Sequence, residues 1–244
     1  MVIMPTVNNK QRLIQRLCSS SKRTAEGAAK DDRSILEHLL YAVCREGATR
    51  DQADEAFQTL RDTFFDWNEI RVSAEREVVD AVSHLPNAEV RAYRLINLLK
   101  EVFETTYSFD LESLHKKGLK QAQKHLERLG ASQYAVAYTI QHGLGGHSLP
   151  IDADMKRALV RLEVLEEEGD EEAAMASLEH LIPKAKGSVF CENVADIAQS
   201  FCRETAPRCS ACCARELCTT GQANASRSHA NGSHGGSARS RTRG

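Results

Sequence analysis

Four cysteines near the C-terminal end of the sequence carry its clearest chemical signal. Cys202, Cys209, Cys212 and Cys218 follow one another with the spacing C-x6-C-x2-C-x5-C. Four thiolates in one short loop can converge on a single centre, either a tetrahedral zinc ion or a cubane iron–sulfur cluster with one cysteine per iron. Structural zinc sites usually pair two C-x2-C units far apart in sequence, whereas this segment has one, so the spacing favours a [4Fe-4S] cluster over zinc.

A disulfide framework is the least favoured use of these cysteines. Disulfides need an oxidising compartment, and the apolar stretch that begins at Met1 is too short for a secretory signal. We therefore expect an intracellular protein, in the cytoplasm or, in a bacterium, the nucleoid. Cys213 directly follows a predicted ligand and is either a spare thiol or an alternative ligand. Cys18, Cys44 and Cys191 lie on hydrophobic or helical faces and are predicted to be small buried side chains.

The composition predicts an all-α protein. Hydrophobic residues make up 41% of the 244 residues but aromatic residues only 5%, so the core must rest on Leu, Ile, Val and Ala, which together with abundant Glu, Lys, Arg and Gln favours helices. No segment of any length alternates as a strand does. The net charge of −2 means that a nucleic-acid site would have to be a local basic patch. No apolar run is long enough to cross a bilayer.

Apolar residues recur at helical spacing from Ser34 onward, and the helix that they predict is expected to end at a glycine C-cap, Gly47. In the predicted helix over 88–103, we expect Val90 to face inward with the leucines. Ser73 is the predicted N-cap of a following helix, and Trp67 is expected to pack in the core or between domains. The acidic run 166–172 is expected to be a solvated loop or a helix start. The other predicted helices cover residues 9–17, 52–65, 78–85, 110–114, 175–182 and 189–201.

The cysteine spacing, at the end of a helical chain, resembles the iron–sulfur loop of endonuclease III and of the adenine-specific mismatch glycosylases. Both belong to the helix-hairpin-helix DNA glycosylase superfamily. The resemblance implies two helical lobes, a barrel lobe over 34–146 and a cluster lobe over 147–220 on which residues 1–33 pack, followed by a disordered basic tail over 221–244. DNA would lie across the cleft between the lobes, and the cluster would be structural.

The segment Leu126–Ser132 occupies the place of the hairpin of this superfamily. That hairpin reads roughly Leu-Pro-Gly-Val-Gly-Arg-Lys, and its backbone amides hold a DNA phosphate. The first leucine, the hydrophobe and Gly130 are kept here, whereas the proline and the first glycine are replaced, the glycine by Arg128. The resemblance implies DNA contact by Gly130, Ser132 and Gln133, with Arg128 beside them, but weaker than in the superfamily.

Two further positions decide the chemistry that the resemblance implies. Bifunctional members attack the sugar with a lysine at the end of the hairpin, where this chain has Ser132, and a Schiff base requires an amine. Lys120 and Lys124, on the preceding helix, are expected to be solvated. Asp152 matches the catalytic aspartate, which stabilises an oxocarbenium-like sugar and assists water attack on a flipped nucleotide. Asp152 would also serve as a helix N-cap, and Asp154 competes with it for either role.

These features predict a base excision repair protein that acts on double-stranded DNA as a monomer, without membrane contact. The first hypothesis is a monofunctional DNA N-glycosylase that uses Asp152 and lacks the Schiff-base lysine. The alternative is a non-catalytic relative that binds DNA or a repair partner. The altered hairpin, the absent lysine and the absence of the glutamine of the superfamily from Arg45–Thr49 favour this alternative. The damaged base is not identified by the sequence.

Overall fold

The computed structural model describes residues 7–19 and 32–224. Within these ranges all regular secondary structure is helical, and there is no strand. The all-α prediction is thereby confirmed. One group of elements covers the first part of the described chain: α3 (Ile35–Arg45), α4 (Arg50–Thr63), α5 (Trp67–Val72), α6 (Glu75–Ala81), α7 (Ala88–Thr106), the 3-10 helix η1 (Glu112–Lys116), α8 (Leu119–Arg128), α9 (Gln133–Tyr138) and the π-helix η2 (Thr139–Gly143).

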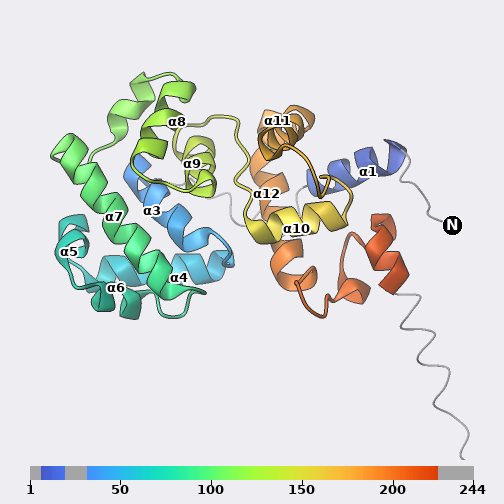
Figure 1. Ribbon diagram of the computed structural model, residues 1–244, viewed down its shortest axis with the longest axis horizontal. Helices are drawn as coiled ribbons and strands as arrows, with labels where there is room; N and C mark the ends of the chain where they lie inside the picture. The colour runs from blue at the N-terminus through green and yellow to red at the C-terminus, as the bar shows by residue number, and fades with distance from the viewer. Residues whose placement is uncertain (1–6, 20–31, 225–244) are drawn as a thin grey trace, which may run out of the picture.

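A second group combines the N-terminal helix with the C-terminal part of the chain. Its members are α1 (Val7–Leu17), α10 (Ala153–Arg161), α11 (Glu171–Leu181), η3 (Lys184–Lys186), α12 (Gly187–Asp196), the π-helix η4 (Ile197–Phe201), η5 (Cys209–Ala211) and η6 (Arg215–Leu217). Figure 1 shows the two groups side by side, with α3–α9 on the left and α1 and α10–α12 on the right. Although α1 lies at the other end of the sequence, it contacts α12 and η6. The exact domain boundaries remain predictions.

Helix α3 is the centre of the first group. It contacts α4, α7, α9 and η2, and the apolar residues that predicted it are almost fully buried, among them Leu36, Leu39 and Leu40. Its N-terminus is fixed by a capping box, in which the Ser34 hydroxyl accepts from the Glu37 N–H and the Glu37 carboxylate accepts from the Ser34 N–H. Helix α3 is thus a rigid core element whose C-terminal end points to the second group.

Two of the local predictions are wrong. Val90 is 50% exposed, because the buried stripe of α7 includes Arg91 instead, whose guanidinium bonds to backbone carbonyls at the end of α3. Ser73 ends α5 rather than starting α6, since its hydroxyl donates to the Glu69 carbonyl. The N-cap of α6 is Ala74, whose N–H donates to Glu77. Both errors arise where a polar side chain finds a backbone partner that the hydrophobic pattern does not reveal.

Trp67 packs in the first group, with its ring centroid 5.7 Å from that of Phe57. The end of the acidic run forms the start of α11, capped by Asp170. Residues 219–224 are helical, so the ordered structure continues past the predicted start of the tail, and residues 225–244 lie outside the described residues. None of the described helices combines the length and the apolar character that crossing a membrane requires.

Candidate nucleic-acid interface and active site

The turn between α8 and α9 keeps the geometry of a tight hairpin. Gly130 has φ of +79°, in the left-handed region that glycine adopts without strain. Its N–H donates to the Glu127 carbonyl (3.0 Å), and the Ala131 N–H donates to the Leu126 carbonyl (3.3 Å). These two bonds define a Schellman motif at the end of α8. The chain therefore turns sharply here even though the proline and the first glycine of the hairpin are replaced.

Ser132 caps α9 and also contacts Glu46, the residue at the end of α3. Its hydroxyl oxygen accepts from the Ala135 N–H (3.2 Å), and the hydroxyl donates to Oε2 of Glu46 (2.9 Å). Glu46 is in turn paired with Arg94 on α7 (3.1 Å). Gln133, the first residue of α9, is exposed. Ser132, which the resemblance implies stands in place of the lysine of bifunctional enzymes, is thus a capping serine whose hydroxyl both donates and accepts a hydrogen bond.

A concentration of positive charge surrounds this hairpin. Residues 116–128 contain a single acid, Glu127, and five exposed cations, none of which forms an ion pair with a described residue: Lys116, Lys117, Lys120, Lys124 and Arg128. The pKa of His125 is lowered, first by burial and then by the charges of Lys117 and Arg128. Although the whole chain has a net charge of −2, residues 116–128 form a local basic surface.

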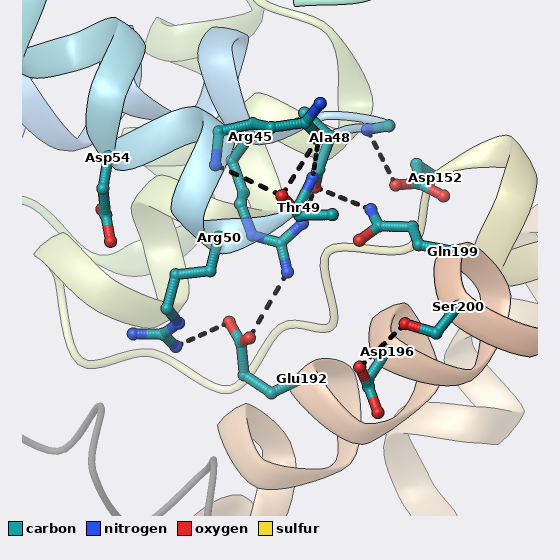
Figure 2. A network of polar contacts seen from close by, with 12 residues as sticks. Arg45, Ala48, Thr49, Arg50, Asp54, Asp152, Glu192, Asp196, Gln199 and Ser200 are labelled. Carbon is teal, nitrogen blue, oxygen red and sulfur yellow. Dashed lines mark hydrogen bonds and ion pairs between the residues drawn. The ribbon is translucent and has the colours of Figure 1, made fainter.

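Asp152 lies at the start of α10, and both of its carboxylate oxygens accept hydrogen bonds. Oδ1 accepts from the Met155 N–H (2.8 Å), which makes Asp152 the N-cap of α10, as predicted. Oδ2 accepts from the backbone N–H of Gly47 (3.0 Å), in the turn after α3 (Figure 2). Asp152 is only 7% exposed. Asp154, by contrast, points to Arg157 in the next turn of α10.

The turn that contacts Asp152 comprises residues 45–49, between α3 and α4, and we call it the α3–α4 turn. Gly47 has φ of +68°, which confirms the predicted glycine at the C-terminal end of α3. From α7, Arg91 donates to the carbonyls of Cys44 (3.1 Å) and Glu46. From η4, Gln199 donates to the Ala48 carbonyl (2.6 Å) (Figure 2). Both groups of helices therefore hold this turn in place.

Glu192 on α12 completes this contact with two ion pairs (Figure 2). Its carboxylate lies 3.3 Å from Arg45, at the end of α3, and 2.9 Å from Arg50, at the start of α4. Burial on its own would raise the pKa of Glu192, but the charges of Arg45 and Arg50 outweigh it and lower the pKa. The acid therefore stays ionised between the two groups of helices.

The four predicted metal ligands line one small cavity of about 20 Å³. Its other walls include Leu162, Ile197 and Phe201. N–H groups lie within hydrogen-bonding distance of three of the sulfur atoms: Gly221 at Cys218 (3.3 Å), Asn224 at Cys209 (3.4 Å) and Arg161 at Cys202 (3.7 Å). Among the described residues, no group of three or more His, Cys, Asp or Glu side chains is arranged to hold a metal ion. The cluster therefore remains a prediction.

Cys213 is exposed and does not line this cavity. A hydrogen bond from Cys212 lowers the pKa of Cys213 to about 6. Of the other cysteines, Cys44 and Cys191 are buried as predicted, and Cys18 is half-buried.

Helix α10 connects the two candidate sites. Asp152 caps its first turn, while Arg161 at its last residue donates to the carbonyls of Arg203 (2.7 Å) and Glu204 (3.2 Å). Arg157 donates to the Cys202 carbonyl (3.1 Å). The cysteine loop is therefore anchored to the same helix that positions Asp152.

No protein-family model matches the sequence, and no curated protein matches it. Solved structures do match. A trapped covalent endonuclease III–DNA intermediate has a TM-score of 0.67 at 14% identity, covering 91% of this chain and 100% of that chain. A thermostable thymine-DNA glycosylase has a TM-score of 0.61 at 16% identity, covering 88% and 98%. A 3-methyladenine DNA glycosylase of H. pylori, bound to 1,N6-ethenoadenine, has a TM-score of 0.55 at 14% identity, covering 78% and 97%.

These likenesses establish the fold. The chain has the two-lobed helical fold of the helix-hairpin-helix DNA glycosylases, as the cysteine spacing and the Asp152 segment predicted. The sequence did not reveal the contacts of the α3–α4 turn. Glu46, Arg91 and Glu192 occupy positions where charged residues of amphipathic helices usually face water. Of these three residues, only Arg91 left a signal in the sequence. The apolar stripe of α7 can be drawn one residue later than expected, and this register places Arg91 inside instead of Val90.

Proposed function

We propose that the protein is a monofunctional DNA N-glycosylase of base excision repair that acts on double-stranded DNA. The observation that carries this proposal is the placement of Asp152, a buried carboxylate fixed at a helix start and held by the turn that also contacts the hairpin. As the glycosidic bond breaks, positive charge develops on the sugar, and a preorganised carboxylate stabilises that charge. Burial strengthens the effect, because water screens the interaction less.

The hairpin and α8 supply a surface suited to the DNA backbone. Free amides at the start of α9, beside Gly130, Ser132 and the side chain of Gln133, can approach one phosphate closely. The unpaired cations of α8, including Arg128 next to the hairpin, favour further phosphates through counterion release. Such contacts position the duplex without reading its sequence.

We propose the four cysteines as the ligands of a [4Fe-4S] cluster, although their side chains are not gathered around one centre in the described structure. Cys202, Cys209, Cys212 and Cys218 would hold it, because they line one cavity and N–H donors lie beside three of their sulfur atoms. Hydrogen bonds to sulfur are among the features that tune such clusters. When bound, the cluster would supply a closed thiolate anchor for a loop that carries several arginines. We assign it no step in base removal.

A second candidate function is binding without catalysis. It is favoured by one observation: both oxygens of Asp152 already accept backbone hydrogen bonds, so a purely structural role accounts for this residue. In that case the protein would bind DNA or a repair partner, and the hairpin would remain its contact surface.

A glycosylase assay separates the two functions. The protein is incubated with a panel of damaged and mismatched duplexes, and alkali then reveals abasic sites. We expect strand breaks only after alkali, and no covalent adduct with borohydride, because Ser132 offers no amine. Base release that Asp152→Asn abolishes supports the enzyme. Tight duplex binding without release on any substrate supports the binding protein, and efficient borohydride trapping contradicts the monofunctional assignment and directs attention to Lys120 and Lys124.

A further inference from the structure

Glu46 and Gly47 join the hairpin to Asp152 through two consecutive residues. The Glu46 carboxylate accepts the Ser132 hydroxyl at the start of α9 (2.9 Å). The next backbone N–H, that of Gly47, donates to Asp152 (3.0 Å). The segment that would contact phosphate and the residue that would face the sugar are therefore tied to the same peptide unit.

This peptide unit has little freedom to move. Arg91, which is buried, donates to the Glu46 carbonyl, and Arg94 pairs with the Glu46 carboxylate (3.1 Å). The left-handed conformation of Gly47 disfavours any other residue there. A displacement of Ser132 would be passed to the Gly47 N–H through a short, fixed connection.

The charge of Glu46 is unexpected at this position. Its side chain is 25% exposed and lies beside a hairpin proposed to bind phosphate, where a negative charge opposes binding. Simple electrostatics therefore predicts that removing this charge tightens DNA binding. If Glu46 is instead needed for the geometry of the hairpin, removing its side chain weakens DNA binding.

We propose that Glu46 is a positioning residue that orients the hairpin, through Ser132, relative to Asp152, through Gly47. This inference rests on the proposed function, because it needs the hairpin to bind DNA. Glu46 acts through its hydrogen bond to Ser132 and does not itself contact the reacting atoms. A single turn thereby sets the distance between the held phosphate and the attacked nucleotide.

The test compares how tightly the full-length protein and its variants bind a short labelled duplex that carries a tetrahydrofuran abasic analogue. Binding is measured by fluorescence anisotropy at low salt. The melting temperature of each variant is the control for folding. Glu46→Ala should weaken binding about tenfold, the order expected for a lost hydrogen bond to a charged group, despite removing a negative charge. Glu46→Gln should bind within about twofold of the parent, because its amide oxygen still accepts from Ser132.

Two further variants make the result decisive. Glu127→Ala removes a negative charge beside the hairpin without touching Ser132, and it should bind at least as tightly as the parent. Ser132→Gly removes the hydroxyl while costing the helix cap only a few tenths of a kcal/mol, and it should reproduce the loss of Glu46→Ala. If Glu46→Ala does not fold, Glu46→Asp decides the question, because it keeps the charge but shortens the side chain that reaches Ser132, and it should also bind more weakly than the parent.

The inference is overturned if Glu46→Ala and Ser132→Gly bind as tightly as the parent, or if Glu46→Gln loses as much as Glu46→Ala. A parent protein that binds no duplex contradicts the proposed function itself, and the inference with it. A parent that binds while Glu46→Ala binds equally well contradicts only the role of Glu46.

Discussion

The backbone N–H of Gly47 donates to Oδ2 of Asp152 over 3.0 Å, between residues 105 positions apart in the sequence. Asp152 is therefore more than a local helix cap, because one carboxylate oxygen serves its own helix and the other serves the opposite group of helices. Asparagine can replace only one of these acceptors with its carbonyl oxygen, and its NH₂ group would face the remaining N–H donor. The exchange of Asp152 for Asn thus removes a charge and creates one unsatisfied contact.

We expect Asp152→Asn to lower base release by about a hundredfold or more, since the charge that stabilises the transition state is lost. It should also lower the free energy of unfolding by about 1–3 kcal/mol, the cost of an unpaired buried donor. Glycosylase kinetics and thermal melting on the same preparations measure the two effects. Asp154→Asn is the matched control, because Asp154 lies on the same helix, is more exposed, and pairs only with Arg157 one turn on, and partly exposed pairs of this kind contribute about 1 kcal/mol or less. Equal losses in both variants would contradict the assignment of Asp152.

Replacing Lys120 and Lys124 together by Gln should reduce the salt dependence of DNA binding. Each phosphate contact contributes about 0.9 to the slope of log K against log salt concentration, so the loss of two contacts lowers the slope by up to about 1.8. Titrations of one duplex at several salt concentrations give the slope. Lys184→Gln with Lys186→Gln removes two exposed cations from η3 in the second group and should leave it unchanged. An unchanged slope in the α8 variant would remove this helix from the interface.

Anaerobically purified protein should be brown and contain about four irons per chain, as a cubane cluster with one thiolate per iron requires. Cys202→Ala should lose the iron and the colour, because it removes one ligand at the end of η4, where α10 anchors the loop. Cys213→Ala should keep both, since Cys213 does not line the cavity. Iron analysis and the visible absorption spectrum decide, and a colourless folded protein with one zinc would contradict the cluster.

Acid should destabilise the protein through Glu192. Arg45 and Arg50 lower its pKa in the folded state below the ordinary value of 4.5, so its contribution to stability is fully present above that value and is lost as the pH falls through the folded pKa. Glu192→Gln should lower the free energy of unfolding at neutral pH by about 2–4 kcal/mol, because two arginines, one of them buried, lose their partner.

The same variant should depend less on pH below about 4.5 than the parent does. Denaturant unfolding at several pH values measures both effects. Glu166→Gln, in the acidic segment before α11, controls for the removal of any one carboxylate. A variant with the acid sensitivity of the parent would show that another group dominates acid unfolding.

The sequence predicted what depends on neighbours along the chain. The burial of Leu36, Leu39 and Leu40 follows from helical periodicity, and Gly47 and Asp152 were recognised at the ends of their helices because capping depends on local residue type. The contact between Gly47 and Asp152 has no such local signature. It arises only when α3 and α10 are packed, which no spacing within either helix encodes.

Charged residues were the least predictable part of the site. Val90 was expected inside, but Arg91 is buried instead, because its guanidinium donates to several backbone carbonyls. Glu46 and Glu192 look like ordinary surface acids in the sequence. Their roles depend on Ser132, Arg45 and Arg50 as partners, and three-dimensional packing alone selects these.

The ion pairs of Glu192 also limit how the chain can be divided. A fragment that ended before α10 would keep Arg45 and Arg50 but lose the acid that neutralises them, and it would expose the end of α3 to water. The complementary fragment would carry Glu192 without either of its arginine partners. The two groups of helices are therefore separate in shape but are not exchangeable as modules. To transplant one group into a related protein, the residues that pair with its charges in the other group would have to be introduced as well.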